Sequence, residues 1–304
     1  MGKSVSARRA GMSIVAVGLL ATVAACGGSG SKGAREGADG GSAAPDRGGV
    51  ALSPVAALLS AEKSTNAADS ARVESTTTMG STMSMTATGS VGWSDGLRGT
   101  LTLTYTGGAL ADAMRKMGAT SMEARYLPDA YYARMGDAFA AQAGGKHWIR
   151  YPYDALAKLG GGSGAYMKDQ MQNSTPNQSV KMLLASGDVR KVGEETVRGK
   201  ETTHYSGKVD LADFASRSSS LSAAQLADMK KQLEQAGVSS ETIDIWVGDD
   251  DLLVKKVEKG QTANGTFTQT VHYSDYGAGV SVQTPPAGDT ADFTELLRKQ
   301  PKTR

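Results

Sequence analysis

Apolar and polar residues alternate over two neighbouring stretches of the chain. Residues 83–93 place Met, Ala, Val and Trp at alternate positions, with Ser and Thr between them. Residues 97–105 repeat the pattern with Leu and Tyr, and Ser94-Asp95-Gly96 separates the two stretches. A period of two predicts β-strands with one apolar face. The short polar turn predicts an antiparallel hairpin whose apolar side chains lie on one side of the sheet.

Other stretches have the signals of helices. Ser53-Pro54 fits a helix start, and Val55 and Leu58 begin a helical spacing that continues to about residue 68. A second helix is predicted at residues 222–236, where Ser222 and Gln225 fit a capping box and Gly237 a C-terminal cap.

The remaining elements are mostly strands. They are predicted at residues 122–127, 131–135, 147–151, 188–197, 200–209, 241–247, 252–259, 266–273 and 280–283, with a short helix or loop at 110–117, broken helices within 152–187 and a terminal helix near 293–297. Arg198-Gly199 and Asn264-Gly265 are expected to form tight hairpin turns.

These elements predict an α+β fold, with about ten or more antiparallel strands and a few inserted helices. A sheet with one Ser/Thr face and one apolar face must cover the apolar face. A strongly curved sheet, a half-barrel covered by few helices, would leave an apolar cavity between the layers. A completely packed interior, with methionine as ordinary core, is the alternative. The candidate cavity wall consists of Met83, Met85, Leu101, Leu103, Tyr105, Met182, Leu183, Ile243, Ile245, Phe267 and Val271.

The first 25 residues have the layout of an export signal. Lys3, Arg8 and Arg9 precede an uncharged apolar run at residues 12–25. A helix of this length spans about 21 Å, short of the roughly 30 Å hydrocarbon core of a bilayer. This favours a cleaved signal over a permanent membrane helix.

The sequence Val23-Ala24-Ala25-Cys26 resembles a bacterial lipobox. In a lipobox, cleavage between Ala25 and Cys26 would leave a lipidated cysteine as the mature N-terminus. Cys26 is the only cysteine, so it cannot form an internal disulfide. We therefore expect a lipid anchor in the cell membrane, at its extracytoplasmic face.

The next segment predicts a tether. Residues 26–49 are rich in Gly, Ser and Ala and contain almost nothing that could be buried. As a flexible linker this length reaches about 26 Å. The expected organisation is a signal peptide at residues 1–25, a lipidated Cys and linker at 26–49, and a folded domain at 50–304.

The balance of charged residues argues against nucleic acid as a binding partner. The chain has 33 Lys and Arg against 31 Asp and Glu, and three of the cations precede Cys26. The mature chain is therefore close to neutral and lacks the basic excess of nucleic-acid-binding proteins. A hydrophobic share of 39% excludes a wholly disordered chain.

Motifs for catalysis or metal binding were not found. His147, His204 and His272 each lie in a predicted strand without a second His or a Cys at metal-ligand spacing. Asp249-Asp250-Asp251 fits a solvated turn, and the glycine-rich run at residues 160–164 lacks the Lys-Ser/Thr of a phosphate loop. We expect no metal, no cofactor and no enzymatic activity.

Three later segments resemble the LppX/LprG class of actinobacterial cell-envelope lipoproteins. They are residues 188–210, the hairpin sequence IWVGD at 245–249 followed by LLVKK at 252–256, and YSDYG at 273–277 followed by VSVQTPPA at 280–287. The resemblance implies a half-barrel similar to the LolA/LolB lipoprotein carriers, without enzymatic activity and with a hydrophobic pocket for lipids or lipidated molecules.

Three functions then compete. The first is an anchored carrier of a lipid or glycolipid, with an envelope transporter as a further expected partner. The second is a ligand-free scaffold or sensor lipoprotein that binds another envelope protein. The third is an enzyme whose site is assembled from distant residues, which would need a polar cleft with convergent titratable groups. The sequence favours the carrier.

Overall fold

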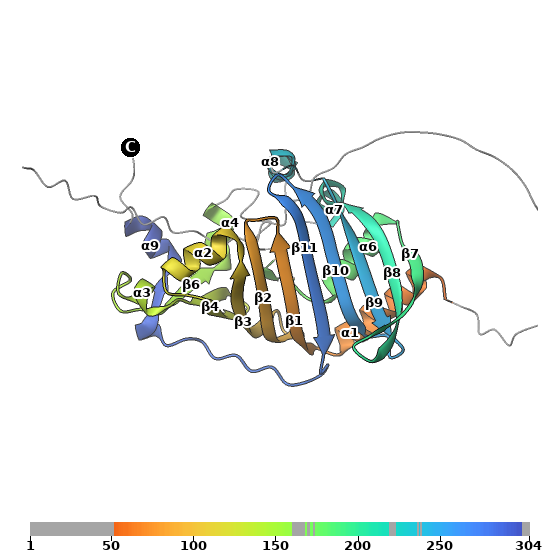
Figure 1. Ribbon diagram of the computed structural model, residues 1–304, viewed down its shortest axis with the longest axis horizontal. Helices are drawn as coiled ribbons and strands as arrows, with labels where there is room; N and C mark the ends of the chain where they lie inside the picture. The colour runs from red at the N-terminus through yellow and green to blue at the C-terminus, as the bar shows by residue number, and fades with distance from the viewer. Residues whose placement is uncertain are drawn as a thin grey trace, which may run out of the picture.

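One curved sheet organises the protein (Figure 1). The computed structural model describes residues 52–159, 168, 171–172, 174–218, 223–235, 237 and 239–299. Within them twelve strands follow the order β12-β6-β5-β4-β3-β2-β1-β11-β10-β9-β8-β7. The strands are β1 Ser70–Met79, β2 Met83–Gly92, β3 Arg98–Gly107, β4 Ser121–Tyr126, β5 Ala130–Arg134, β6 Trp148–Pro152, β7 Arg190–Val197, β8 Lys200–Asp210, β9 Ser240–Gly248, β10 Leu253–Thr262, β11 Gly265–Ser274 and β12 Thr290–Asp292.

The predicted fold class is confirmed, because the sheet is strongly curved and unclosed and the helices are inserted between strands. The pairing is antiparallel except between β12 and β6, which run parallel. The helices are α1 Pro54–Ala67, α2 Gly108–Lys116, α3 Asp137–Ala140, α4 Tyr153–Leu159, α6 Asn177–Ser186, α7 Leu211–Ser218, α8 Ala223–Gln235 and α9 Phe293–Lys299, with a short 3₁₀ turn at Ala287–Asp289.

The sheet face covered by helices is called here the inner face. On β2 it carries Met83, Met85 and Val91, which are buried, while Ser84 and Thr88 point to the other side. Helices α1 and α6 lie against each other, and α6 contacts β8 and β9 (Figure 1). Side chains on a strand alternate between the two faces of the sheet. The apolar residues of the predicted alternation are therefore the ones buried on the inner face.

The predicted hairpins are confirmed. β2 pairs with β3 from Gly92 opposite Arg98 onward. Arg198 and Gly199 form a two-residue turn with φ of 50° and 81°, the left-handed conformation that such turns require. The β10–β11 loop lies one residue earlier than predicted, at residues 263–264, because Thr262 pairs with Gly265.

The helix predictions are confirmed in outline. Ser53 caps α1, and its hydroxyl oxygen accepts a hydrogen bond from the Ala56 amide. α8 occupies the predicted second helix. Ser222, the predicted cap of α8, and the glycine run at 160–164 lie outside the described residues.

The strand predicted at residues 280–283 is wrong. That segment runs along the ends of the strands instead of beside one of them (Figure 1). Side chains hold it there: the Arg125 guanidinium donates to the Gln283 carbonyl at 2.8 Å, and Val282 packs against Leu127, Ala130, Tyr132 and Trp148. A segment that crosses strand ends cannot continue their hydrogen-bond ladder.

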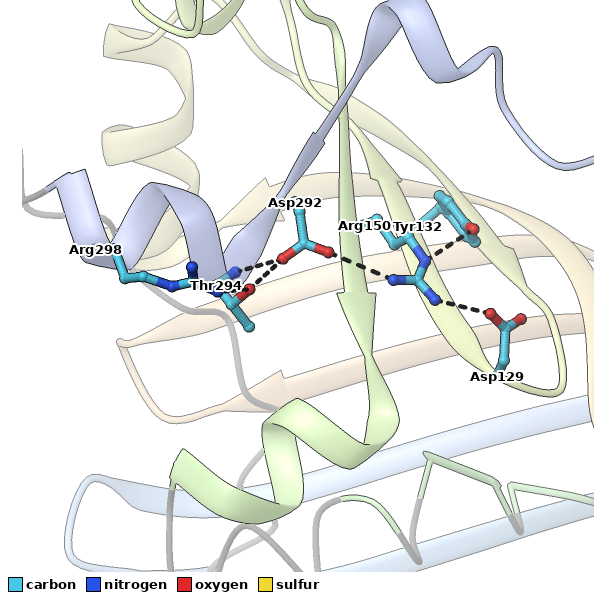
Figure 2. Close-up of polar contacts among 6 residues, drawn as sticks. All are labelled: Asp129, Tyr132, Arg150, Asp292, Thr294 and Arg298. Carbon is cyan, nitrogen blue, oxygen red and sulfur yellow. Dashed lines mark hydrogen bonds and ion pairs between the residues drawn. The ribbon is translucent and has the colours of Figure 1, made fainter.

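A polar network attaches the C-terminal segment to this edge instead (Figure 2). The Arg150 guanidinium contacts Asp129 at 2.9 Å and Asp292 at 3.4 Å, and it donates to the Tyr132 hydroxyl at 3.2 Å. Asp292 accepts from the backbone amide of Thr294 at 2.9 Å, at the start of α9. The network joins β5, β6, β12 and α9.

Candidate functional site: the inner face of the sheet

The predicted wall residues all lie buried or partly buried in the structure. All of them except Phe267 belong to, or pack against, two apolar clusters. The first cluster lies under α1 and α6 and contains, among others, Leu58, Val73, Met182, Leu183, Ile243, Ile245 and Val271. The second cluster lies beside α2 and contains Met83, Met85, Ala87, Leu103, Tyr105, Ala111 and Met114. The prediction that these residues contact a ligand stays a prediction.

Leu101 and Tyr126 connect the two clusters. Both side chains are partly buried and pack against the first and the second cluster. Leu101 lies opposite Gly89 of β2, where a Cβ would collide with the Thr100 carbonyl oxygen and approach the Leu101 side chain. Phe267 is buried in neither cluster and pairs with Met79 near the turn end of β11.

Tyrosines extend this junction along β4, β5 and β6. The rings of Tyr126 and Tyr131 lie 5.1 Å apart, and those of Tyr131 and Tyr151 lie 5.7 Å apart. All three rings keep some accessible surface, yet burial raises the pKa of Tyr126 and Tyr151 to about 12. The rings of Tyr126 and Tyr151 are therefore largely removed from bulk water.

Polar residues also cross the same face, from within the first cluster on β10 toward the second cluster on β2. Lys256 and Glu258 of β10, Gln269 of β11, and Ser75 and Thr77 of β1 form what is called here the polar band. Their register places them together, because Glu258 pairs with Gln269 and Gln269 with Thr77. The Gln269 amide donates to the Thr77 hydroxyl at 3.3 Å. Sequence reasoning missed this band, because polar residues on an inner face break the alternation that identifies it.

Helix α6 is tied to the polar band by Ser179. The Lys256 ammonium donates to the Ser179 hydroxyl at 2.7 Å and to the Glu258 carboxylate at 2.8 Å. The Ser179 hydroxyl donates to the same carboxylate at 2.5 Å. These three groups satisfy one another in a site almost closed to water, as buried charges require.

Two buried carboxyl groups of this region differ in ionisation. Burial raises the pKa of Glu241 to about 8, with repulsion from Glu258 in the same direction and Lys256 opposing it. Burial also works against ionisation of Glu258, but the charge and hydrogen bond of Lys256, with the bond from Ser179, hold its pKa below the ordinary value. At neutral pH the region therefore contains one ion pair and one uncharged acid.

Two hollows are lined by described residues outside the predicted cavity wall. One of about 440 Å³ lies beside α1, between Leu59, Glu62, Lys63, Asn66, Ala67 and Lys181. Another of about 340 Å³ lies between the end of α6 and α7. Neither of these two hollows contains a predicted wall residue.

The opposite face carries an aromatic and charged cluster. His204 stacks on Trp246 with 4.1 Å between ring centroids, and its ring nitrogens contact Glu195 at 3.0 Å and Asp244 at 3.1 Å. Lys255 lies over the Trp246 ring at 3.7 Å. These side chains satisfy one another, so they form a structural cluster on the outer face.

Metal clusters and membrane-spanning helices are absent from the described part of the chain. No group of three or more His, Cys, Asp or Glu side chains there is arranged to hold a metal ion. Among the same residues, no helix has both the length and the apolar character needed to cross a bilayer.

Comparison with known proteins finds two similar chains from Streptomyces. No family model matches the sequence. The chain is 50% identical over 306 residues to a Streptomyces coelicolor protein named "Putative lipoprotein", covering 97% of this chain and 98% of the relative. The chain belongs to that lipoprotein family. It is also 58% identical over 248 residues to an uncharacterized 31.2 kDa protein of Streptomyces griseus, covering 81% of each chain.

The chain is also similar to a solved structure, the lipoprotein LppX of Mycobacterium tuberculosis, with 15% sequence identity and a TM-score of 0.47. The match covers 76% of this chain and 98% of LppX.

The ionisation of Glu241 predicts a pH dependence of stability. A folded pKa of about 8 lies above the ordinary value of 4.5, so the protonated group favours the folded state and this contribution decreases as pH rises between the two values. Relative to Glu241→Gln, the wild-type free energy of unfolding should fall by about 1.4 kcal/mol per pH unit in this window. Urea unfolding at pH 5 to 9 measures it.

Glu234→Gln is the matched control. It removes a carboxylate at an exposed position of α8. A constant difference between wild type and Glu241→Gln across the pH range would show that Glu241 ionises normally in the folded protein.

Proposed function

We propose that this protein is a membrane-anchored lipoprotein that binds a lipid or lipidated molecule on the inner face of its sheet and carries it in the cell envelope. The observation that supports this most directly is the pair of apolar clusters on one face, connected by the partly accessible Leu101 and Tyr126. An apolar surface of this extent, covered by short helices, can exchange contacts with helices for contacts with acyl chains.

The affinity needs no catalytic residue. Each buried methylene contributes about 0.8 kcal/mol, so a long acyl chain can offset the loss of translational freedom on binding. The methionines of the second cluster, Met83, Met85 and Met114, suit this role because their flexible, polarizable side chains adapt to different chain shapes.

Access to the inner face is controlled by the covering helices. α6 packs through Val180 and Leu183 in the first cluster and is joined to β10 by Ser179. α2 contributes Ala111 and Met114 to the second cluster. Displacement of either helix exposes apolar surface, which a lipid then covers, so opening and binding are coupled.

The anchor follows from the N-terminal sequence. Cleavage after Ala25 leaves Cys26 to carry the lipid, and the linker that follows holds the domain near the outer face of the cytoplasmic membrane. The name of the Streptomyces coelicolor relative supports lipidation.

Replacement of Cys26 tests the anchor. In full-length Cys26→Ser expressed in Streptomyces, no thiol is present to accept the lipid. Incorporation of an alkyne-labelled palmitate should be lost, and the protein should move from the membrane fraction to the soluble or secreted fraction. Continued membrane association of Cys26→Ser at the wild-type level would contradict a lipid anchor.

Replacement of Leu101 tests lipid binding. The soluble form that begins at residue 27 is purified without detergent and analysed by native mass spectrometry, followed by solvent extraction and lipid analysis. Wild type should carry acylated molecules at near-stoichiometric amounts. Leu101→Trp fills the junction between the clusters and should reduce the bound fraction at least about tenfold, given about 1.4 kcal/mol per tenfold change.

Leu59→Trp is the matched control, because Leu59 is 52% exposed on α1 and should leave bound lipid unchanged. Thermal unfolding of both variants verifies that they are folded. A wild-type protein that is free of lipid and takes up none when it is added would rule out the carrier and favour a tethered interaction module.

A further inference from the structure

Helix α1 carries apolar side chains on two sides. Leu58 and Ala61 are buried in the first cluster. Val55 and Leu59 are instead 45% and 52% exposed, and Leu52, just before the helix, is 65% exposed. Residues four apart lie on the same side of a helix, so Val55 and Leu59 continue the apolar surface that Leu52 begins. These three exposed side chains are called here the α1 stripe.

The α1 stripe gathers most of the exposed apolar side chains. Of the described residues, five large apolar ones are exposed, and the other two are Met117 after α2 and Val192 on β7. Single exposed apolar residues are common on soluble proteins. A group of them at one place marks an interaction surface.

The α1 stripe lies where the expected tether joins the domain. Leu52 is the first described residue, and residues 27–51 connect it to Cys26, the expected lipid anchor. A short flexible linker raises the effective concentration of a tethered partner to the order of millimolar. Even a weak contact between this surface and the bilayer would therefore be occupied.

Two other occupants fit the α1 stripe less well. Residues 26–49 contain almost no apolar side chain, so the tether itself cannot supply an apolar cover. A second copy of the chain would need a larger surface, because a stable protein interface buries about 800 Å² on each partner. Three partly exposed side chains provide much less than this area.

A hollow with two lysines continues the α1 stripe. Leu59 lines the hollow of about 440 Å³ together with Glu62 and Lys63 of α1 and Lys181 of α6. Glu62 pairs with Lys181 at 3.7 Å, while Lys63 forms no ion pair within the described part of the chain. Two cations against one carboxylate give the hollow a positive charge, which complements lipid phosphate.

We propose that the α1 stripe docks on an anionic bilayer, the one that carries the anchor, and that Lys63 and Lys181 lie at its lipid phosphates. This inference rests on the proposed anchor and carrier function. Interfacial binding of this kind combines buried apolar area with attraction to anionic lipid.

Docking brings the covering helices to the membrane. α1 contacts α6, and the two helices contribute Leu58, Val180 and Leu183 to the first cluster. The helices that cover this part of the inner face are then held against the bilayer that supplies the lipid. The docked orientation shortens the path of an acyl chain through water.

The test uses the only cysteine as the tether. The chain that begins at Cys26 is coupled through its thiol to a maleimide lipid, in vesicles of phosphatidylcholine and phosphatidylglycerol with brominated acyl chains. Leu59→Trp is the probe, because bromine quenches a tryptophan that enters the acyl region. Thr102→Trp, at an exposed position of β3 on the outer face, is the matched control. Wild type gives the background of the three buried native tryptophans.

Leu59→Trp should be quenched and Thr102→Trp should keep its fluorescence. In the Leu59→Trp background, Leu52→Ser together with Val55→Ser should lower the ratio of docked to undocked protein at least about tenfold, because apolar area is lost from the contact. Met117→Ser removes an exposed apolar side chain elsewhere and should leave the ratio unchanged. Thermal unfolding at the wild-type temperature verifies that the variants are folded.

The lysines are tested through the lipid charge. Lys63→Gln and Lys181→Gln should each lower the ratio by about fivefold on vesicles that contain phosphatidylglycerol. Neither exchange should change the ratio on vesicles of phosphatidylcholine alone. Equal ratios for wild type and both variants on the anionic vesicles would overturn the role of the two lysines.

The outcomes separate docking from carriage. Equal quenching of Leu59→Trp and Thr102→Trp overturns the docking surface. An untethered wild-type dimer that Leu52→Ser and Val55→Ser convert to a monomer also overturns it, in favour of a contact between copies. Lipid bound to the untethered wild type in native mass spectrometry leaves the carrier standing in either case. Docking by a chain that takes up no lipid rules out the carrier and supports the docking surface.

Discussion

The apolar inner face of the sheet must be kept from water. The rest of the structure depends on the helices that cover this face. Among the described residues twelve strands form the sheet, and separate helices cover different parts of this face. α1 and α6 cover one part and α2 another, with Leu101 and Tyr126 between them. A face covered in separate parts can be uncovered in parts, which is what a carrier of acyl chains requires.

The polar contacts between α6 and β10 add little net free energy to the stability of the fold. Removing Lys256 and Glu258 from water carries a penalty of several kcal/mol per ion, which their attraction offsets only with good geometry. An apolar pair of similar size would often be as stable. The unpaired amide of Asn177 and the raised pKa of Glu241 add to the cost. Such features concentrate where function opposes stability.

The local alternation of apolar and polar residues predicted many of the strands. The features that it did not predict depend on pairing between strands far apart in the sequence. The alternation at residues 83–105 predicted β2, β3 and the side on which their apolar residues lie, because a strand has a period of two. β1 was missed, since inner positions Ser75 and Thr77 are polar. The parallel pairing of β12 with β6 joins residues about 140 apart, and no local signal encodes it.

The candidate site was predicted in its apolar part alone. Met85 and Ile245 were placed on the buried face, but their division into two clusters depends on strand order and on which helix covers which strands. Lys256 and Glu258 look like solvated charges in the sequence. Only the register with β11 and the contact with Ser179 show that they face inward.

The central claim is that acyl chains bind on the inner face between the helices and the sheet. Photo-crosslinking with a diazirine-bearing fatty acyl probe, followed by peptide mapping, tests it most directly. The account predicts labels on inner-face residues of β2, β3 and β11, such as Met85, Leu101 and Val271. Labels confined to the exposed Leu52, Val55 and Leu59 near the start of α1, or to the outer face around Trp246, would contradict it.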